Sequence, residues 1–161
     1  MYFPREILPI SVVTSAAVNF IISTVIILAF CIGDGLGLTP YILYYPIILI
    51  IQFIFQLGLA FILSAVTVYF RDLEHFVQIV LMLLFYATPI IYSAETIPEN
   101  VRGIIRLNPM THIIEGYRHI FYRQIKPDFS ELGTVLVFSV ILCVVGYLIF
   151  RKLQKGFAEE L

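Results

Sequence analysis

The chain has 161 residues, of which 60% are hydrophobic and only 13% are charged, and its mean hydropathy is +0.97. A soluble domain is about half apolar and about a quarter charged, so this balance predicts an integral membrane protein. The net charge of −1 provides no basic surface of the kind that binds nucleic acid.

The first predicted membrane-spanning helix covers about residues 11–32 and follows a short interfacial lead-in, YFPREILP. Its length suits a bilayer core of about 30 Å. Four polar residues recur at every fourth position and therefore share one face: Ser11, Ser15, Asn19 and Ser23. Helix packing explains the serines. For Asn19, packing and a place along a water-filled path are equally open.

The second predicted helix covers about residues 42–70, after a glycine-rich turn with the sequence GDGLGLTP. It is longer than a bilayer requires, so we expect it to tilt, to kink at Pro46 or to protrude. Gln52 and Gln56 lie one turn apart on it. Because amide groups in lipid need hydrogen-bond partners, we expect their face to contact protein or water.

A charged turn separates the second helix from the third. The apolar run ends at Phe70, the charged or titratable residues Arg71, Asp72, Glu74 and His75 follow, and the apolar character resumes over about residues 76–92. Charge at the centre of a bilayer is costly, so the pattern predicts a helical hairpin whose turn lies at one membrane face. Pro89 is expected to bend or end the third helix.

The segment 93–130 carries most of the charge that lies away from the chain ends. Two short amphipathic helices are predicted in it. The first starts at Pro98 and stops by residue 107; the second has Asn108 as its N-cap, Pro109 as its first residue, and runs to about residue 121. Helices of this kind lie in the membrane interface or dip into it.

The second short helix has an apolar face that includes Tyr117, and its polar face carries His112, Glu115, Arg118 and His119. We interpret the polar face as a solvated surface with local pairing rather than an acid–base site. No catalytic residue and no metal site is predicted.

A fourth spanning helix is predicted over about residues 132–150, followed by Arg151, Lys152 and Lys155. A basic cluster at a helix end favours the cytoplasmic side. With about four spans, the N-terminus and the charged turn then lie in the cytoplasm, and the 93–130 segment lies outside. The expected fold is an all-α integral membrane protein with one transmembrane domain, residues 1–161, and two short external helices.

Four stretches in this order, YFPREILP, VYFRDLEHFVQIVL, TPIIYSAETIP and LNPMTHIIEGYR, resemble the ABC-2 type transporter permeases. Within that family the chain is most similar to permeases that export lipid-linked polysaccharides, namely O-antigen, capsule and teichoic acid. The resemblance covers the whole chain. It implies the last four of six membrane helices, so we expect a partial permease domain that lacks the first two.

The resemblance also implies partners and roles. It implies a homodimer in the bacterial cytoplasmic membrane, surrounded by lipid, that is driven by a separate ABC ATPase. ATP and magnesium would be used by that ATPase, and this chain would bind no cofactor. Family members use the turn between these helices to approach the ATPase, which assigns coupling to Arg71, Asp72, Glu74 and His75. The external gate is assigned to Pro98, Asn108, Pro109, Tyr117 and Arg118.

Sugar chains are bound mainly by aromatic faces and scattered hydrogen bonds. On that basis a weak set of candidates for a translocation path is Asn19, Gln52, Gln56, Gln78, Phe85, Tyr86 and Tyr92. Aromatic residues in membrane helices more often face lipid or pack against protein.

The sequence has no G-x-x-x-x-G-K-[ST], H-E-x-x-H or G-x-S-x-G motif. Two alternatives remain open beside the permease subunit. One is a membrane-bound transferase that acts on lipid-linked substrates, and the other is a truncated remnant that transports nothing.

Overall fold

The structure is a computed structural model that describes residues 5–35, 37–70, 72–88, 90 and 98–154. All regular elements in these ranges are helices, and three stretches are long and apolar enough to cross a membrane: Ile7–Gly33, Pro40–Tyr69 and Phe129–Leu153. The predicted class, an all-α integral membrane protein, is confirmed.

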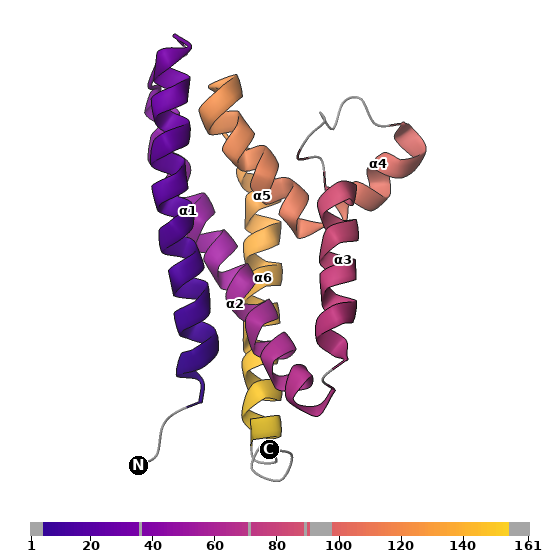
Figure 1. Cartoon of the computed structure of the whole chain (residues 1–161). Coiled ribbons are helices and arrows are strands. Elements are labelled where there is room, and N and C mark those ends of the chain that lie inside the picture. The colour runs from indigo at the N-terminus through magenta and orange to yellow at the C-terminus, as the bar shows by residue number, and fades with distance from the viewer. Residues whose placement is uncertain (1–4, 36, 71, 89, 91–97, 155–161) are drawn as a thin grey trace.

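Helix α1, Ile7–Gly33, begins four residues before the predicted start of the first span. Apart from one stripe of small polar residues its surface is apolar, yet only Pro9, Val13 and Thr24 are buried in the chain. Figure 1 shows α1 at one side of the molecule, next to α2. A helix this apolar and this exposed must be covered by lipid or by another chain.

The second predicted helix has a different start. Pro40–Tyr44 forms a short 3-10 helix, and the α-helix α2 covers Tyr45–Tyr69. Pro46 therefore lies in the first turn of α2. A proline there removes only an N–H that has no helical partner, so it starts the helix and does not kink it.

Helix α2 packs against helix α6, which covers Phe129–Leu153, and the two form the core. Their backbones come into close contact where the helices cross. A Cβ atom built on Gly58 would lie 2.8 Å from the backbone nitrogen of Cys143. A Cβ atom on Gly146 would lie 2.6 Å from the carbonyl oxygen of Gly58. Small residues of this kind permit close helix contact in membranes, where burial of apolar surface provides little driving force.

Helix α6 starts three residues before the predicted position and ends three residues after it. The Asp128 side chain caps its first turn by accepting the backbone N–H groups of Ser130, at 2.9 Å, and Glu131, at 3.4 Å. The cap satisfies donors that have no partner within the helix.

Helix α3 covers Leu73–Ala87, so the predicted span 76–92 is wrong at both ends. The helix ends early because Thr88, which has an extended backbone, precedes Pro89, and a residue before proline disfavours the helical conformation. Its 15 residues span only about 22 Å at about 1.5 Å per residue. Helix α3 is therefore shorter than a bilayer core of about 30 Å.

Two short helices follow, α4, Glu99–Arg106, and α5, Pro109–Arg118. Pro98 immediately precedes α4 instead of opening it. A π-helical turn, His119–Arg123, replaces the predicted α-helical end of α5, and Gln124 closes it with a positive φ of 53°. In Figure 1 these elements lie in the upper half, whereas the start of α1, the α2–α3 junction and the end of α6 lie together at the bottom.

Candidate functional site

The corner between α4 and α5 is held by the side chain of Asn108. Its Oδ1 accepts the backbone N–H of Met110 at 3.0 Å, and its Nδ2 donates to Thr88 Oγ1 at 2.9 Å. The Thr88 hydroxyl in turn donates to the carbonyl of Leu84 at 2.6 Å. One asparagine thus caps α5 and ties its start to the end of α3.

A second threonine joins α5 to α4. The buried Thr111 hydroxyl donates to the carbonyl oxygen of Ile105 at 2.9 Å, in the last turn of α4. Irregular backbone at membrane depth is tolerated only where its polar groups are satisfied by protein or water. Because side chains satisfy groups at the ends of α3, α4 and α5, this corner is suited to dip into the apolar layer.

The apolar face of α5 packs into the junction of α2 and α6. Ile113 and Ile120 are buried against Ile48 of α2 and against Leu132 of α6. At Gly116 a Cβ atom would lie 3.2 Å from Ile48 Cδ1, so the glycine lets α5 approach α2 closely.

Tyr117 is the polar contact within this apolar junction. Its hydroxyl donates to Gln52 Oε1 at 2.7 Å. Gln52 is only 6% exposed, so its amide oxygen depends on this partner within the chain. Burial, and secondly the neighbouring Tyr45, raises the pKa of the Tyr117 hydroxyl, which keeps the hydroxyl protonated and able to donate.

Aromatic rings from three elements surround Tyr117. Its ring centroid lies 5.4 Å from Phe20 of α1, 5.8 Å from Tyr45 of α2 and 6.2 Å from Phe121. The Tyr45 hydroxyl continues the contact by donating to Thr24 of α1 at 3.0 Å. We call Phe20, Tyr45, Tyr117 and Phe121 the aromatic junction; it connects α5 and the turn after it to α1 and α2.

Arg118, the neighbour of Tyr117 and the last residue of α5, contacts a different segment. Its guanidinium Nη2 donates to the carbonyl oxygen of Ile90 at 2.7 Å. It therefore contacts the segment that follows α3, and the sequence alone gives no indication of this contact.

Three side chains of the kinds that can bind metal ions lie close together where α5 meets the start of α6. His112 Nδ1 lies 2.9 Å from Glu131 Oε2, and His112 Nε2 lies 2.7 Å from the carbonyl oxygen of Arg106. Glu115 completes a set in which one ligand atom from each of the three side chains lies within 4.8 Å of the others. The sequence predicts the shared face of His112 and Glu115 but not the approach of Glu131.

The predicted path residues fall in three separate places. Gln52 and Gln56 lie on α2, the first buried and the second half-buried. Gln78, Phe85 and Tyr86 are exposed on α3. Tyr92 lies outside the described residues.

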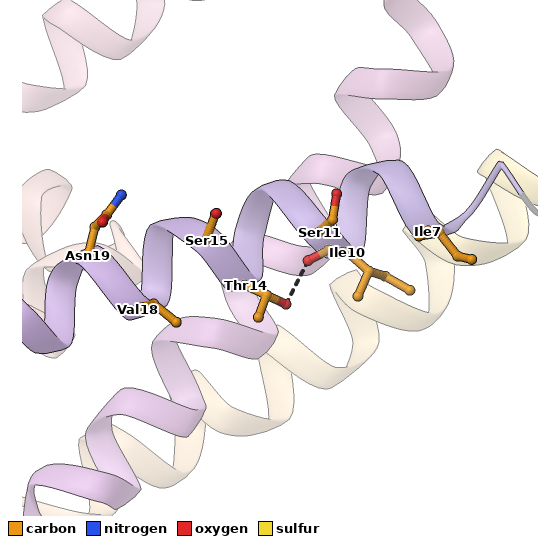
Figure 2. A pocket seen from close by; sticks show the side chains of 7 residues that line it. All are labelled: Ile7, Ile10, Ser11, Thr14, Ser15, Val18 and Asn19. Carbon is orange, nitrogen blue, oxygen red and sulfur yellow. Dashed lines mark hydrogen bonds between the residues drawn. The ribbon is translucent and has the colours of Figure 1, made fainter.

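Asn19 is on α1, on the other side of the molecule from α3 (Figure 1). It lines a shallow groove along α1, where Figure 2 shows Ser11, Ser15 and Asn19 pointing to the same side. Thr14 also lines the groove and donates its hydroxyl to the carbonyl of Ile10 at 2.7 Å. The exposed polar face of α1 thus follows the four-residue spacing seen in the sequence.

The predicted coupling residues lie at the start of α3. Asp72, Glu74 and His75 are all exposed, and Glu74 lies in the first turn, where a negative charge favours the helix. Arg71 lies outside the described residues. These side chains are available to a partner at the end of the molecule where α2 ends and α6 ends (Figure 1).

The amino-acid sequence is similar to those of known proteins. Residues 1–122 match the family described as ABC-2 type transporter. The chain is 37% identical over 161 residues to the O-antigen export system permease protein RfbA of Myxococcus xanthus, with 99% of this chain and 62% of the relative covered. Two Klebsiella pneumoniae proteins of the same name are 37% and 36% identical, with 99% of this chain and 61% of each relative covered. The chain thus spans about three fifths of the length of these relatives.

Proposed function

Because the chain belongs to the ABC-2 type transporter family, we propose that it is a membrane-spanning permease subunit of an ATP-driven exporter of lipid-linked polysaccharide. The observation that carries the proposal is the alignment of 99% of the chain with three relatives named as O-antigen export permeases. An O-antigen-type polymer is the favoured cargo, and the bacterial cytoplasmic membrane is the site of action.

The exposed surfaces support a dimer of permeases. Helices α1 and α3 leave most of their apolar side chains uncovered by the chain, and each also exposes an amide, Asn19 and Gln78. An amide facing lipid lacks a hydrogen-bond partner, which is costly. A second copy with the polymer beside it covers one of these faces, since α1 and α3 lie on opposite sides of the molecule, and gives the amide there a polar environment (Figure 1).

The α4–α5 corner is the proposed external gate. It rests on the α2–α6 core through Gly116 and on α1 through the aromatic junction. The Tyr117–Gln52 hydrogen bond is the one polar link between α5 and α2 in this apolar contact, among the residues that the structure describes. Opening the gate then requires this link to break, and the hydrogen bond contributes about 1 kcal/mol to the closed arrangement.

Energy comes from a separate ATPase that uses ATP and magnesium. Arg71, Asp72, Glu74 and His75 form the proposed contact with it, because in the sequence they follow the end of α2 directly and reach into the first turn of α3. Asp72→Ala is expected to reduce export several-fold while the protein still inserts. Asp34→Ala is the matched control, since Asp34 is exposed at the other end of α1.

The test of the function is complementation. The permease and its ATPase are expressed in a strain whose own O-antigen permease is deleted, and surface polymer is measured by immunoblot of whole cells. We expect surface polymer when the permease and the ATPase are both intact. When the phosphate-binding lysine of the ATPase is replaced, we expect the polymer to stay inside the cell. Absence of surface polymer from a correctly inserted, ATPase-bound permease contradicts the proposal, and polymer modification without the ATPase identifies a transferase instead.

A further inference from the structure

We propose that His112, Glu115 and Glu131 bind a divalent transition-metal ion of the zinc type, which fastens α5 to the start of α6 on the external side. The three side chains offer one imidazole nitrogen and two carboxylate oxygens, all within 4.8 Å of one another. Zinc accepts nitrogen and carboxylate ligands at about 2.0–2.2 Å, and three protein ligands with a water are a common set.

The orientation of His112 favours a metal ion at this place. Its Nε2 lies 2.7 Å from the carbonyl oxygen of Arg106, the last residue of α4. A carbonyl oxygen only accepts hydrogen bonds, so Nε2 must carry a proton and donate it. Metal-bound histidines very commonly donate their second ring nitrogen to a backbone carbonyl in this way.

With the proton on Nε2, the neutral tautomer of the ring has its lone pair on Nδ1, which lies 2.9 Å from Glu131 Oε2. A lone pair and a carboxylate oxygen at this distance need a cation between them, which is either a second proton on the ring, giving an ion pair, or a metal ion. The Glu115 carboxylate, one turn away on the same face of α5, makes no hydrogen bond or ion pair among the described residues and is available as the third ligand.

The local structure holds the ligands on regular elements. His112 and Glu115 are three residues apart on α5, and Glu131 lies in the first turn of α6, which Asp128 caps. The site therefore joins two helices, and through the Arg106 carbonyl it also touches the end of α4. A metal ion here adds a link across the outer end of the proposed gate, although binding itself does not depend on the transport function.

Zinc binding to the purified full permease in nanodiscs tests the proposal. The protein is stripped with a chelator, and zinc affinity is measured by competition with a chromophoric chelator and by metal analysis after dialysis. We expect one zinc ion per chain, at least tenfold tighter than magnesium or calcium because one ligand is an imidazole. His112→Gln and Glu131→Gln are expected to weaken zinc binding at least tenfold, and His75→Gln, at the other end of the molecule, to leave it unchanged.

Glu115→Gln separates a metal site from a simple ion pair. It keeps the His112–Glu131 contact, so the fold is retained, but it removes a zinc ligand. We expect at least tenfold weaker zinc binding and loss of the zinc-dependent rise in melting temperature. No zinc binding by the intact protein, or binding that is equal in the Glu115→Gln and intact proteins, overturns the proposal and leaves a protonated histidine paired with Glu131.

Discussion

Replacing Tyr117 with phenylalanine tests the hydrogen bond that joins α5, part of the proposed gate, to α2. The substitution keeps the ring, and therefore its contacts with Phe20, Tyr45 and Phe121, and removes only the hydroxyl. Gln52 Oε1 then loses its donor at 2.7 Å while it stays buried. The predicted effect is confined to one polar interaction.

Two sets of measured values bound the expected loss of unfolding free energy. Leaving a buried acceptor without a donor costs about 1–3 kcal/mol in soluble proteins. Hydrogen bonds between membrane helices are weaker in measured cycles, at about 0.6 kcal/mol on average and about 1.7 kcal/mol at most. Because the amide oxygen of Gln52 is enclosed on α2, we expect Tyr117→Phe to lower the free energy of unfolding by about 1 kcal/mol.

A double-mutant cycle with Gln52→Leu isolates this term. The two single variants and the pair are unfolded reversibly in mixed detergent, and the coupling energy is calculated from the four free energies. We expect a coupling of about 0.5–1.5 kcal/mol. Tyr122→Phe is the matched control, since that ring is 73% exposed on the turn after α5, and it is expected to change nothing. Additive single effects, with zero coupling, refute the assignment of Tyr117 and Gln52 as partners.

Two further substitutions test the corner and the core. Asn108→Ala removes the α5 cap and the bond to Thr88, so we expect a loss of about 1–2 kcal/mol of unfolding free energy, and the exposed Asn100→Ala on α4 is the control. Equal losses in the two variants would rule out a capping role. Gly146→Ala places a methyl group 2.6 Å from a backbone oxygen of α2, so we expect a loss of about 1–3 kcal/mol by thermal unfolding. Gly133→Ala, with nothing within 4 Å, is expected to be neutral, and a neutral Gly146→Ala would exclude the tight crossing.

Local sequence signals predicted much of the fold. The cap and first residue of α5 are where the Asn108–Pro109 pair predicts them, because capping and proline geometry depend on neighbouring residues only. The end of α3 follows from the same kind of signal, since Thr88 precedes a proline, but the predicted boundary continued past it because the apolar composition continues. The α-helix α2 starts about one turn later than predicted, because the apolar composition already begins in the 3-10 helix Pro40–Tyr44.

The contacts that build the candidate site could not be predicted in this way. Tyr117 faces inward as its helical spacing predicts, yet nothing local selects Gln52, 65 residues earlier, as its partner. The approach of Glu131 to His112 depends on how α5 lies against α6, and the crossing at Gly146 depends on the α2–α6 angle. Such pairings are set by packing between helices, which one sequence does not specify residue by residue.

The central claim is that α5 must move relative to α2 for export, and a reversible tether between them tests it directly. Ile48 Cγ1 lies 3.7 Å from a Cβ atom built on Gly116, so the two positions are in side-chain contact, and cysteines are placed at both for disulfide formation by oxidation. The background lacks Cys31 and Cys143, and each single-cysteine variant serves as a control.

Surface polymer is measured in cells that carry the double-cysteine permease with its ATPase, before and after oxidation and again after reduction. We expect oxidation to abolish export and reduction to restore it, while the single-cysteine variants export throughout. A fully crosslinked, ATPase-bound permease that exports at the rate of the reduced protein contradicts the account, because α5 would then not gate the exit.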